Sequence, residues 1–176
     1  MFTTEEIRIA NATSRSSGAS VRNKDGSLRA VVPKYVESIA RKEDKILDYG
    51  AGKWAVHTLY LREKGFDCTA YDFGDNVKYI HDQNALKKQY DIVFASNVLN
   101  VCSSHNMLVN VIKEIYNAIE ENGIAIINYP SSPRKANFTE QDVRCAIAYV
   151  FASTEIEMVG GTKSAPVWKI KKEGKW

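Results

Sequence analysis

Apolar positions along the chain follow two spacings, short continuous runs and a helical period. The continuous runs predict buried strands, because a strand covered on both faces of a sheet carries few polar residues. They fall at residues 46–49, 67–71, 90–95 and 124–129. Spacings of three and four between apolar residues predict one helix that begins near Val31 and three more over residues 55–64, 107–120 and 139–149.

Strands and helices therefore alternate along most of the chain, and two β-like runs close it, at 154–159 and 167–172. Alternation of this kind places helices on both faces of a parallel sheet. A short segment from Val77 to Ile80 is expected to add one more strand. We predict an α/β three-layer sandwich with a mostly parallel seven-stranded sheet and one antiparallel strand in a C-terminal hairpin.

The first thirty residues are polar and rich in Ser, Ala, Asn and Arg. Such a segment buries too little apolar surface to fold alone. We expect residues 1–30 to form a flexible N-terminal segment or a lid that orders on ligand, and residues 31–176 to form a single domain.

Composition narrows the class of protein. A chain of 176 residues with 44% hydrophobic and 26% charged residues fits one folded domain. No apolar run approaches the roughly 20 residues that span a bilayer. The first residues lack the basic and then apolar form of a secretion signal, so a cytoplasmic protein is expected.

Cysteine and histidine residues give no sign of a metal site. The three cysteines are odd in number, widely spaced and set in apolar segments, which favours reduced thiols that serve packing. They are Cys68, Cys102 and Cys145. His57, His81 and His105 share no metal-ligand spacing, so no metal is predicted.

Two glycines follow the first predicted strand and lie close to an acidic residue. Asp48 ends the apolar run, and Gly50 and Gly52 come directly after it. A glycine turn between a strand and a helix lets the backbone pass close to a nucleotide-like ligand. In a right-handed crossover the next strand ends beside this turn, which places Asp72 at the same carboxyl edge of the sheet.

Further signals occur in a fixed order. They are Asp82 before a short helix, Ser96-Asn97-Val98-Leu99-Asn100-Val101 after the strand at 90–95, and Asn122-Gly123 before a strand. Together with the glycine turn and Asp72, this order resembles the class I S-adenosylmethionine-dependent methyltransferases over about residues 31–172. The chain departs from that pattern at Trp54, where a third glycine is usual.

The resemblance implies a role for each position in binding S-adenosylmethionine. Gly50 and Gly52 would approach the methionine part, and Asp48 would accept a hydrogen bond from its ammonium group or from a water. Asp72 would bind the ribose hydroxyls, and Phe73 would offer a face to the adenine. The remaining cofactor residues are Asp82, at the exocyclic amine of the adenine, and Ser96 and Asn97, which would face the methyl group and its acceptor.

The methyl acceptor is less well defined by the sequence. Asn97 matches the lead residue of base-amine methyltransferases, but the prolines and the stacking aromatic are missing. No proline stands beside Cys102, as cytosine C5 methylation requires. We assign the orientation of the acceptor to Asn97, Asn100 and Tyr129.

The distribution of charge favours a nucleic acid as the acceptor. Residues 8–35 hold six basic residues and one acid, and residues 46–130 hold seven basic and ten acidic residues. The loop 128–135 adds Tyr129 and two cations at the carboxyl edge. We expect a DNA or RNA acceptor. A small-molecule acceptor, or a cofactor-binding protein without transfer activity, are the alternatives.

Overall fold

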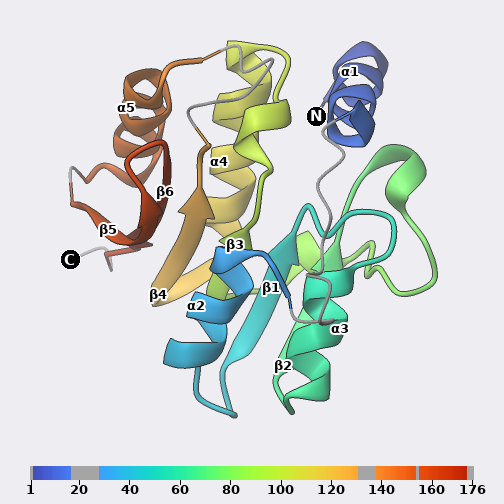
Figure 1. Cartoon of the computed structure of the whole chain (residues 1–176), viewed down its shortest axis with the longest axis vertical. Coiled ribbons are helices and arrows are strands. Elements are labelled where there is room, and N and C mark those ends of the chain that lie inside the picture. Colours follow the sequence, from blue (N-terminus) through green and yellow to red (C-terminus); the bar gives the residue numbers. More distant parts are fainter. Residues whose placement is uncertain (1, 17–27, 131–137, 154, 174–176) are drawn as a thin grey trace.

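The structure is a computed structural model that describes residues 2–16, 28–130, 138–153 and 155–173. Six strands form one sheet in the order β2-β1-β3-β4-β6-β5 (Figure 1). Their bounds are β1 Lys45–Tyr49, β2 Asp67–Tyr71, β3 Tyr90–Ala95, β4 Ile119–Asn128, β5 Ile156–Thr162 and β6 Ala165–Lys171. Neighbouring strands from β2 to β4 are parallel, and β6 is antiparallel to both β4 and β5.

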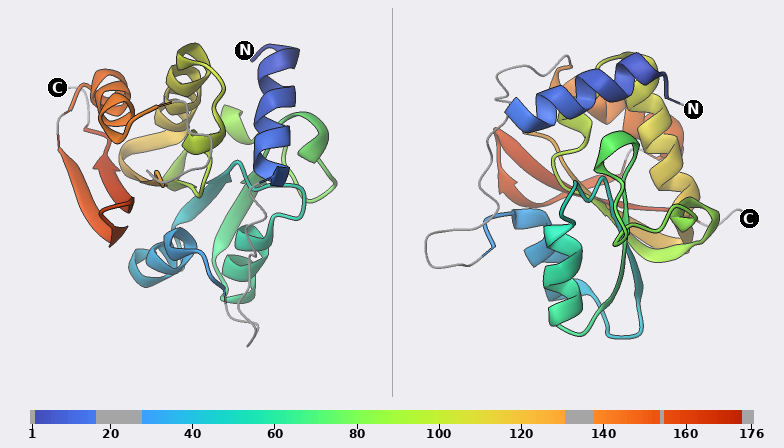
Figure 2. Two further views of the ribbon diagram at one scale, coloured as in Figure 1. Left: turned by 45° about the horizontal axis from the view of Figure 1, so that its top comes forward. Right: turned by 90° about the vertical axis from the view of Figure 1, so that its right-hand side faces the viewer.

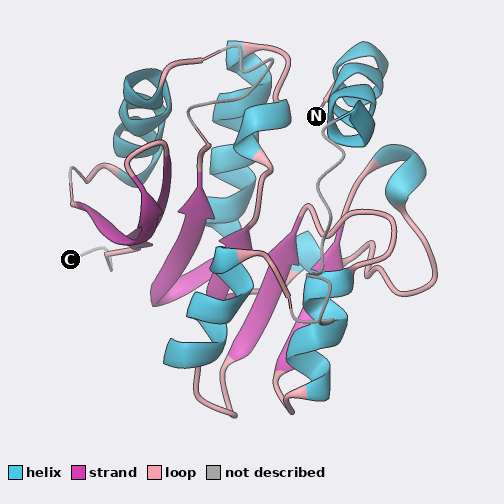
Figure 3. Ribbon diagram, in the orientation of Figure 1, coloured by secondary structure: helices cyan, strands magenta, loops and turns pink. Residues whose placement is uncertain are grey.

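Helices cover both faces of this sheet (Figures 2 and 3). One face packs against α2 (Val31–Ile39) and α3 (Val56–Glu63), and the other against α4 (His105–Ala118) and α5 (Glu140–Phe151). Successive residues of β1 point to opposite faces, so that Ile46 joins the first core and Leu47 the second. The predicted three-layer α/β architecture is confirmed.

The prediction of a seventh strand is wrong. Residues 77–80 form no strand, and in the described parts of the chain a parallel bridge between Ala70 and His81 is the only pairing beyond β2. The His81 N–H donates to the Lys78 carbonyl at 3.0 Å, so the segment curls into a turn. The side chains of Lys78 and Tyr79 are exposed to solvent, so they do not hold the segment against the sheet.

Helix ends follow local capping chemistry. At the start of α5 the Thr139 hydroxyl accepts a hydrogen bond from the Asp142 N–H, and the Asp142 carboxylate accepts one from the Thr139 N–H. This reciprocal cap confirms the predicted start of that helix. Ser104 caps α4 without a reciprocal bond, its hydroxyl accepting from the Met107 N–H at 3.0 Å. That helix therefore begins two residues before the sequence predicted.

The N-terminal segment contains a helix, α1 (Thr4–Ser16), that lies beyond the carboxyl ends of the strands, above the loops that follow them (Figures 1 and 2). Residues 17–27, which hold Arg22 and Lys24 of the basic residues in 8–35, lie outside the described residues. Cys68 and Cys102 are buried, but Cys145 is exposed on α5, so the packing role predicted for all three cysteines fails for Cys145. Within the described ranges, no helix has the length and apolar character needed to cross a membrane.

Candidate functional site

The turn after β1 needs glycine at two positions for different reasons. Gly50 has φ +75°, and a Cβ there would lie 2.6 Å from Cγ2 of Val98. Gly52 has φ +70°, and a Cβ there would meet no atom within 4 Å. The N–H groups of Gly50 and Ala51 both donate to the Tyr71 carbonyl at 2.9 Å, which closes the turn over the end of β2.

Asp72 lies beside this turn, as the crossover rule predicted. Its carboxylate accepts from the N–H of Gly52 at 2.6 Å and from its own neighbour Phe73 at 2.7 Å. Only 7% of the residue is exposed, and burial raises the pKa of its carboxyl, while these hydrogen bonds oppose the rise. Each carboxylate oxygen has more than one lone pair, so the group can still accept a hydrogen bond from a bound hydroxyl.

Asp48 lies beneath the turn and does not line the cavity beside it. Its Oδ2 accepts a hydrogen bond from the Thr58 hydroxyl at 2.8 Å, and only 1% of the residue is exposed. Burial, with a smaller contribution from the Asp72 carboxylate, raises the pKa of Asp48 to about 7. At neutral pH the group can therefore hold or release a proton close to the glycine turn.

The segment after β3 is fixed by a pair of amides that sequence reasoning did not identify. Asn97 has φ +58°, and its N–H donates to Asn128 Oδ1 at 2.7 Å, while Asn128 Nδ2 donates to Asn97 Oδ1 at 2.8 Å. The two residues stand at the carboxyl ends of β3 and β4. Their pairing holds Asn97 in a left-handed conformation that asparagine tolerates better than most residues.

Two polar atoms next to this pair have no partner. Among the residues that the structure describes, only Ser96 Oγ and Asn100 Oδ1 are buried side-chain oxygens or nitrogens without a hydrogen bond. A buried polar atom left unpaired costs about 1–3 kcal/mol, so such atoms mark places where a ligand or water belongs.

A small cavity of about 50 Å³ brings several of the predicted residues together. Its walls include Gly50, Gly52, Asp72, Phe73 and Asn97. Five predicted site residues do not line it, namely Asp48, Asp82, Ser96, Asn100 and Tyr129. Asp82 binds the Lys88 ammonium at 2.7 Å, and the Tyr129 hydroxyl donates to the Phe138 carbonyl. Ser96 and Asn100 lie on the segment after β3 without lining the cavity. The predicted loop residues 131–135 lie outside the described residues.

One side of α1 forms the remaining wall of this cavity, through Ala10, Asn11 and Ser14. The Asn11 side chain accepts from Asn76 Nδ2 at 3.1 Å, and the rings of Phe2 and Phe73 lie 5.2 Å apart. The signal for this wall was present in the sequence as a spacing of three and four between Ile7, Ala10, Asn11 and Ser14, but a polar composition masked it.

Trp54, the departure from the glycine pattern, points away from the cavity. It is 70% exposed and does not line the cavity, so its bulk does not narrow the space beside the turn. The Lys53 ammonium lies 4.9 Å from the centroid of its ring.

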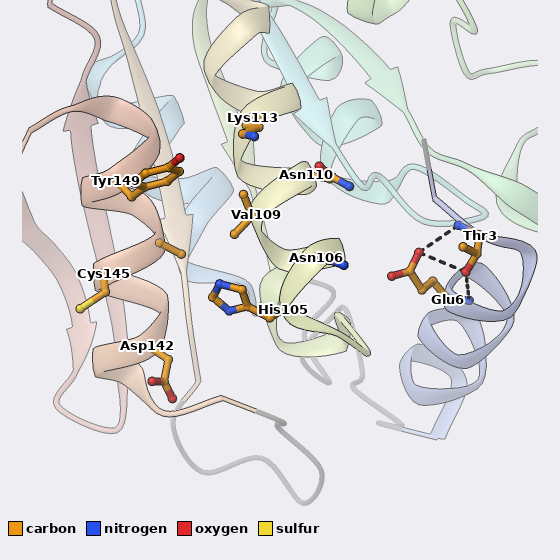
Figure 4. A pocket seen from close by; sticks show the side chains of 11 residues that line it. Thr3, Glu6, His105, Asn106, Val109, Asn110, Lys113, Asp142, Cys145 and Tyr149 are labelled. Atoms are coloured by element: carbon orange, nitrogen blue, oxygen red, sulfur yellow. Dashed lines mark hydrogen bonds between the residues drawn. The ribbon is translucent and has the colours of Figure 1, made fainter.

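A larger hollow of about 660 Å³ lies elsewhere, between α4, α5 and the start of α1 (Figure 4). It contains none of the predicted site residues. The carboxylates on its walls serve helix caps, because Glu6 binds Thr3 and Ser104, and Asp142 binds Thr139. We therefore place the candidate site at the smaller cavity, where the glycine turn and the acid meet, and where Asn97 and Val101 bring the segment with the two unpaired polar atoms to the wall.

Comparison with known proteins identifies the class. A family model described as a methyltransferase domain matches residues 21–154, so the chain belongs to that family. It is a methyltransferase, and its cofactor is S-adenosylmethionine. No curated protein matches the chain.

Solved structures share the fold at low sequence identity. A TehB-like S-adenosylmethionine-dependent methyltransferase from Corynebacterium glutamicum is 15% identical, with a TM-score of 0.64 over 95% of this chain and 99% of that one. Magnesium protoporphyrin IX methyltransferase from Synechocystis, with bound S-adenosylmethionine, is 14% identical, with a TM-score of 0.56 over 96% and 83%. A protein studied for the conversion of a disulfide bond into a thioacetal group in echinomycin biosynthesis is 13% identical, with a TM-score of 0.63 over 94% and 93%.

Proposed function

We propose that S-adenosylmethionine binds along the carboxyl edge of β1 and β2 and that the methyl group is transferred beside Ser96, Asn97 and Asn100. The observation that carries this proposal is the meeting of an open glycine turn and a buried acid in one cavity, beside a segment after β3 that carries two unpaired polar atoms next to the cavity residues Asn97 and Val101. These residues fit the cofactor, because Asp72 offers oxygens to the ribose hydroxyls and Gly52 leaves room for a close backbone approach.

The cofactor supplies a methyl group bound to a sulfonium, which is a good leaving group. The role left to the residues of the chain is therefore to position the reactants. Asn100 Oδ1 can accept a hydrogen bond from the acceptor group, and the Ser96 hydroxyl can donate one or accept one. Asn128 holds Asn97 at the end of β3 through the two amide hydrogen bonds. Positioning of this kind needs no strong general base.

We further propose that α1 is a lid on a domain formed by residues 31–176. Pockets for ligands of this size hold about 300–1,000 Å³, far more than the cavity that α1 leaves. Helix α1 must therefore move before the cofactor enters. Gly74 lets it lie close, since a Cβ there would be 2.5 Å from Cγ2 of Ile7.

For the acceptor we propose a nucleic acid, supported by the basic residues of 8–35. A small-molecule acceptor is the second candidate, because the Synechocystis relative is described as acting on magnesium protoporphyrin IX, and the echinomycin protein also acts in the chemistry of a small molecule.

Radiolabelled cofactor separates the two acceptors. The enzyme would be incubated with methyl-labelled S-adenosylmethionine and, separately, with RNA, single-stranded DNA, duplex DNA and a low-molecular-weight cell extract. Label that precipitates with a nucleic acid, and is lost with Asp72→Asn, supports our proposal. Label found only in the low-molecular-weight fraction assigns a small acceptor and contradicts it.

A further inference from the structure

Two aromatic side chains stand uncovered on neighbouring turns near the cofactor cavity. Trp54 is 70% exposed and Tyr79 is fully exposed. Single exposed apolar side chains are common on protein surfaces. Here, however, each aromatic residue directly follows a lysine, in the dipeptides Lys53-Trp54 and Lys78-Tyr79. We call these two segments the Lys-aromatic turns.

His81 links the two Lys-aromatic turns to each other. Its Nδ1 accepts a hydrogen bond from the Lys78 N–H at 2.9 Å, so the proton of the neutral ring is on Nε2. That Nε2 lies 2.9 Å from the Gly52 carbonyl and donates to it. Trp54 and Tyr79 are each two residues from this link. With about 3.8 Å between successive Cα atoms, their backbones lie within the reach of a short oligonucleotide.

The lysines of these turns are available to an anion. The Lys53 ammonium lies over the Trp54 ring, and both lysine side chains are exposed. Neither forms an ion pair with any residue in the described parts of the chain. The next acid along the chain, Asp82, is already paired with Lys88 at 2.7 Å. The surface therefore offers flat apolar faces together with unpaired positive charge.

We infer that the Lys-aromatic turns bind single-stranded nucleic acid, with bases stacked on Trp54 and Tyr79 and phosphates beside Lys53 and Lys78. Base stacking on aromatic faces with nearby cations is how proteins hold single strands without reading their sequence. Gly52, which His81 ties to the second turn, also lines the cofactor cavity, so a bound strand passes the mouth of that site. This inference rests on the proposed nucleic-acid acceptor.

Fluorescence anisotropy with a labelled single-stranded oligonucleotide tests the inference. We expect Trp54→Ala and Tyr79→Ala each to weaken binding at least about fivefold, and Trp54→Phe and Tyr79→Phe to stay within about twofold of the unmodified protein, because a phenyl ring still stacks. Lys53→Ala with Lys78→Ala should reduce the dependence of affinity on salt. Tyr149→Ala, which removes an aromatic side chain that is 75% exposed on α5, is the matched control and should change nothing.

Several results would overturn the inference. They are unchanged binding after both aromatic residues are replaced by alanine, equal affinity for duplex and single strand, and binding to anionic phospholipid vesicles but to no oligonucleotide. Calorimetry with S-adenosylmethionine on the same samples keeps the two proposals apart. Cofactor binding and methyl transfer to a small molecule without strand binding would refute only the inference. Aromatic-dependent strand binding without methylation of any nucleic acid would refute only the proposed acceptor.

Discussion

The two glycines of the turn after β1 should respond differently to the same substitution. Gly50→Ala places a methyl group 2.6 Å from Val98 Cγ2 and 3.3 Å from Cγ1, at φ +75°. The left-handed backbone costs about 1–2 kcal/mol and the overpacking about 1–3 kcal/mol more. Gly52→Ala, at φ +70° with nothing within 4 Å, carries only the backbone cost.

Urea denaturation of both variants measures this difference. We expect Gly50→Ala to lose about 2–5 kcal/mol of unfolding free energy and Gly52→Ala about 1–2 kcal/mol. Val98→Ala removes both atoms that clash, so Gly50→Ala should cost about 1–3 kcal/mol less in that background than in the unmodified protein. Equal losses for the two glycine variants, or no relief from Val98→Ala, would refute the packing argument.

Cofactor binding should show the opposite order. Gly52 lines the cavity, so its added methyl group stands in the space that the cofactor needs, although the fold tolerates it. Calorimetry at a temperature where both variants are folded should show that Gly52→Ala loses more affinity for the cofactor than Gly50→Ala does, although Gly52→Ala loses less stability. Unchanged affinity of Gly52→Ala for the cofactor would show that the cofactor does not bind beside the turn.

Three further perturbations test the acids and the lid. Because the pKa of Asp48 is raised to about 7, the contribution of its carboxyl to stability is fully present below about pH 4 and is lost as the pH rises through 7, by up to about 4 kcal/mol. Asp48→Asn should flatten this pH dependence in denaturation experiments. An unchanged slope would show that other groups cause it. Asp72→Asn should weaken S-adenosylmethionine binding about tenfold or more in calorimetry, since hydrogen bonds to charged groups contribute about 1.5–3 kcal/mol, and full affinity would remove Asp72 from the site. Asn11 Oδ1 lies 3.1 Å from Asn76 Nδ2, so cysteines at these two positions, in a Cys145→Ser background, can be joined by a short thiol cross-linker that a reductant cleaves. The cross-linked protein should not bind cofactor until it is reduced, and binding by the cross-linked form would show that α1 is not a lid.

Local patterns in the sequence were sufficient for much of the sheet and for part of the site. The strand at β1, the glycine turn and Asp72 were predicted because an apolar run, two glycines and a crossover rule each act over a few residues. Residues 77–80 were misread as a strand, since a short apolar pair cannot be distinguished from a turn. The capping pair at Thr139 was identified because both partners lie three residues apart.

Other features depend on contacts between distant segments, which spacing alone does not show. The Asn97–Asn128 pair requires the register of β3 against β4. The position of Asp48 under the turn, bonded to Thr58, follows from how α3 packs on the sheet. The course of α1 across the cavity depends on Gly74 and Asn76, far along the chain, so its polar sequence indicated only a flexible segment or a lid.

The single bridge between Ala70 and His81 divides the cofactor site into two halves of unequal local stability. The half beside β1 and β3 belongs to a continuous ladder, while residues 74–84 are held by side-chain hydrogen bonds and turns. Opening that second half breaks few buried contacts, so its amides should exchange with solvent far faster than those of the central strands. The half of the site formed by residues 74–84, which includes Asn76 of the cavity wall, can thus loosen while the sheet stays folded, and bound cofactor would slow that exchange.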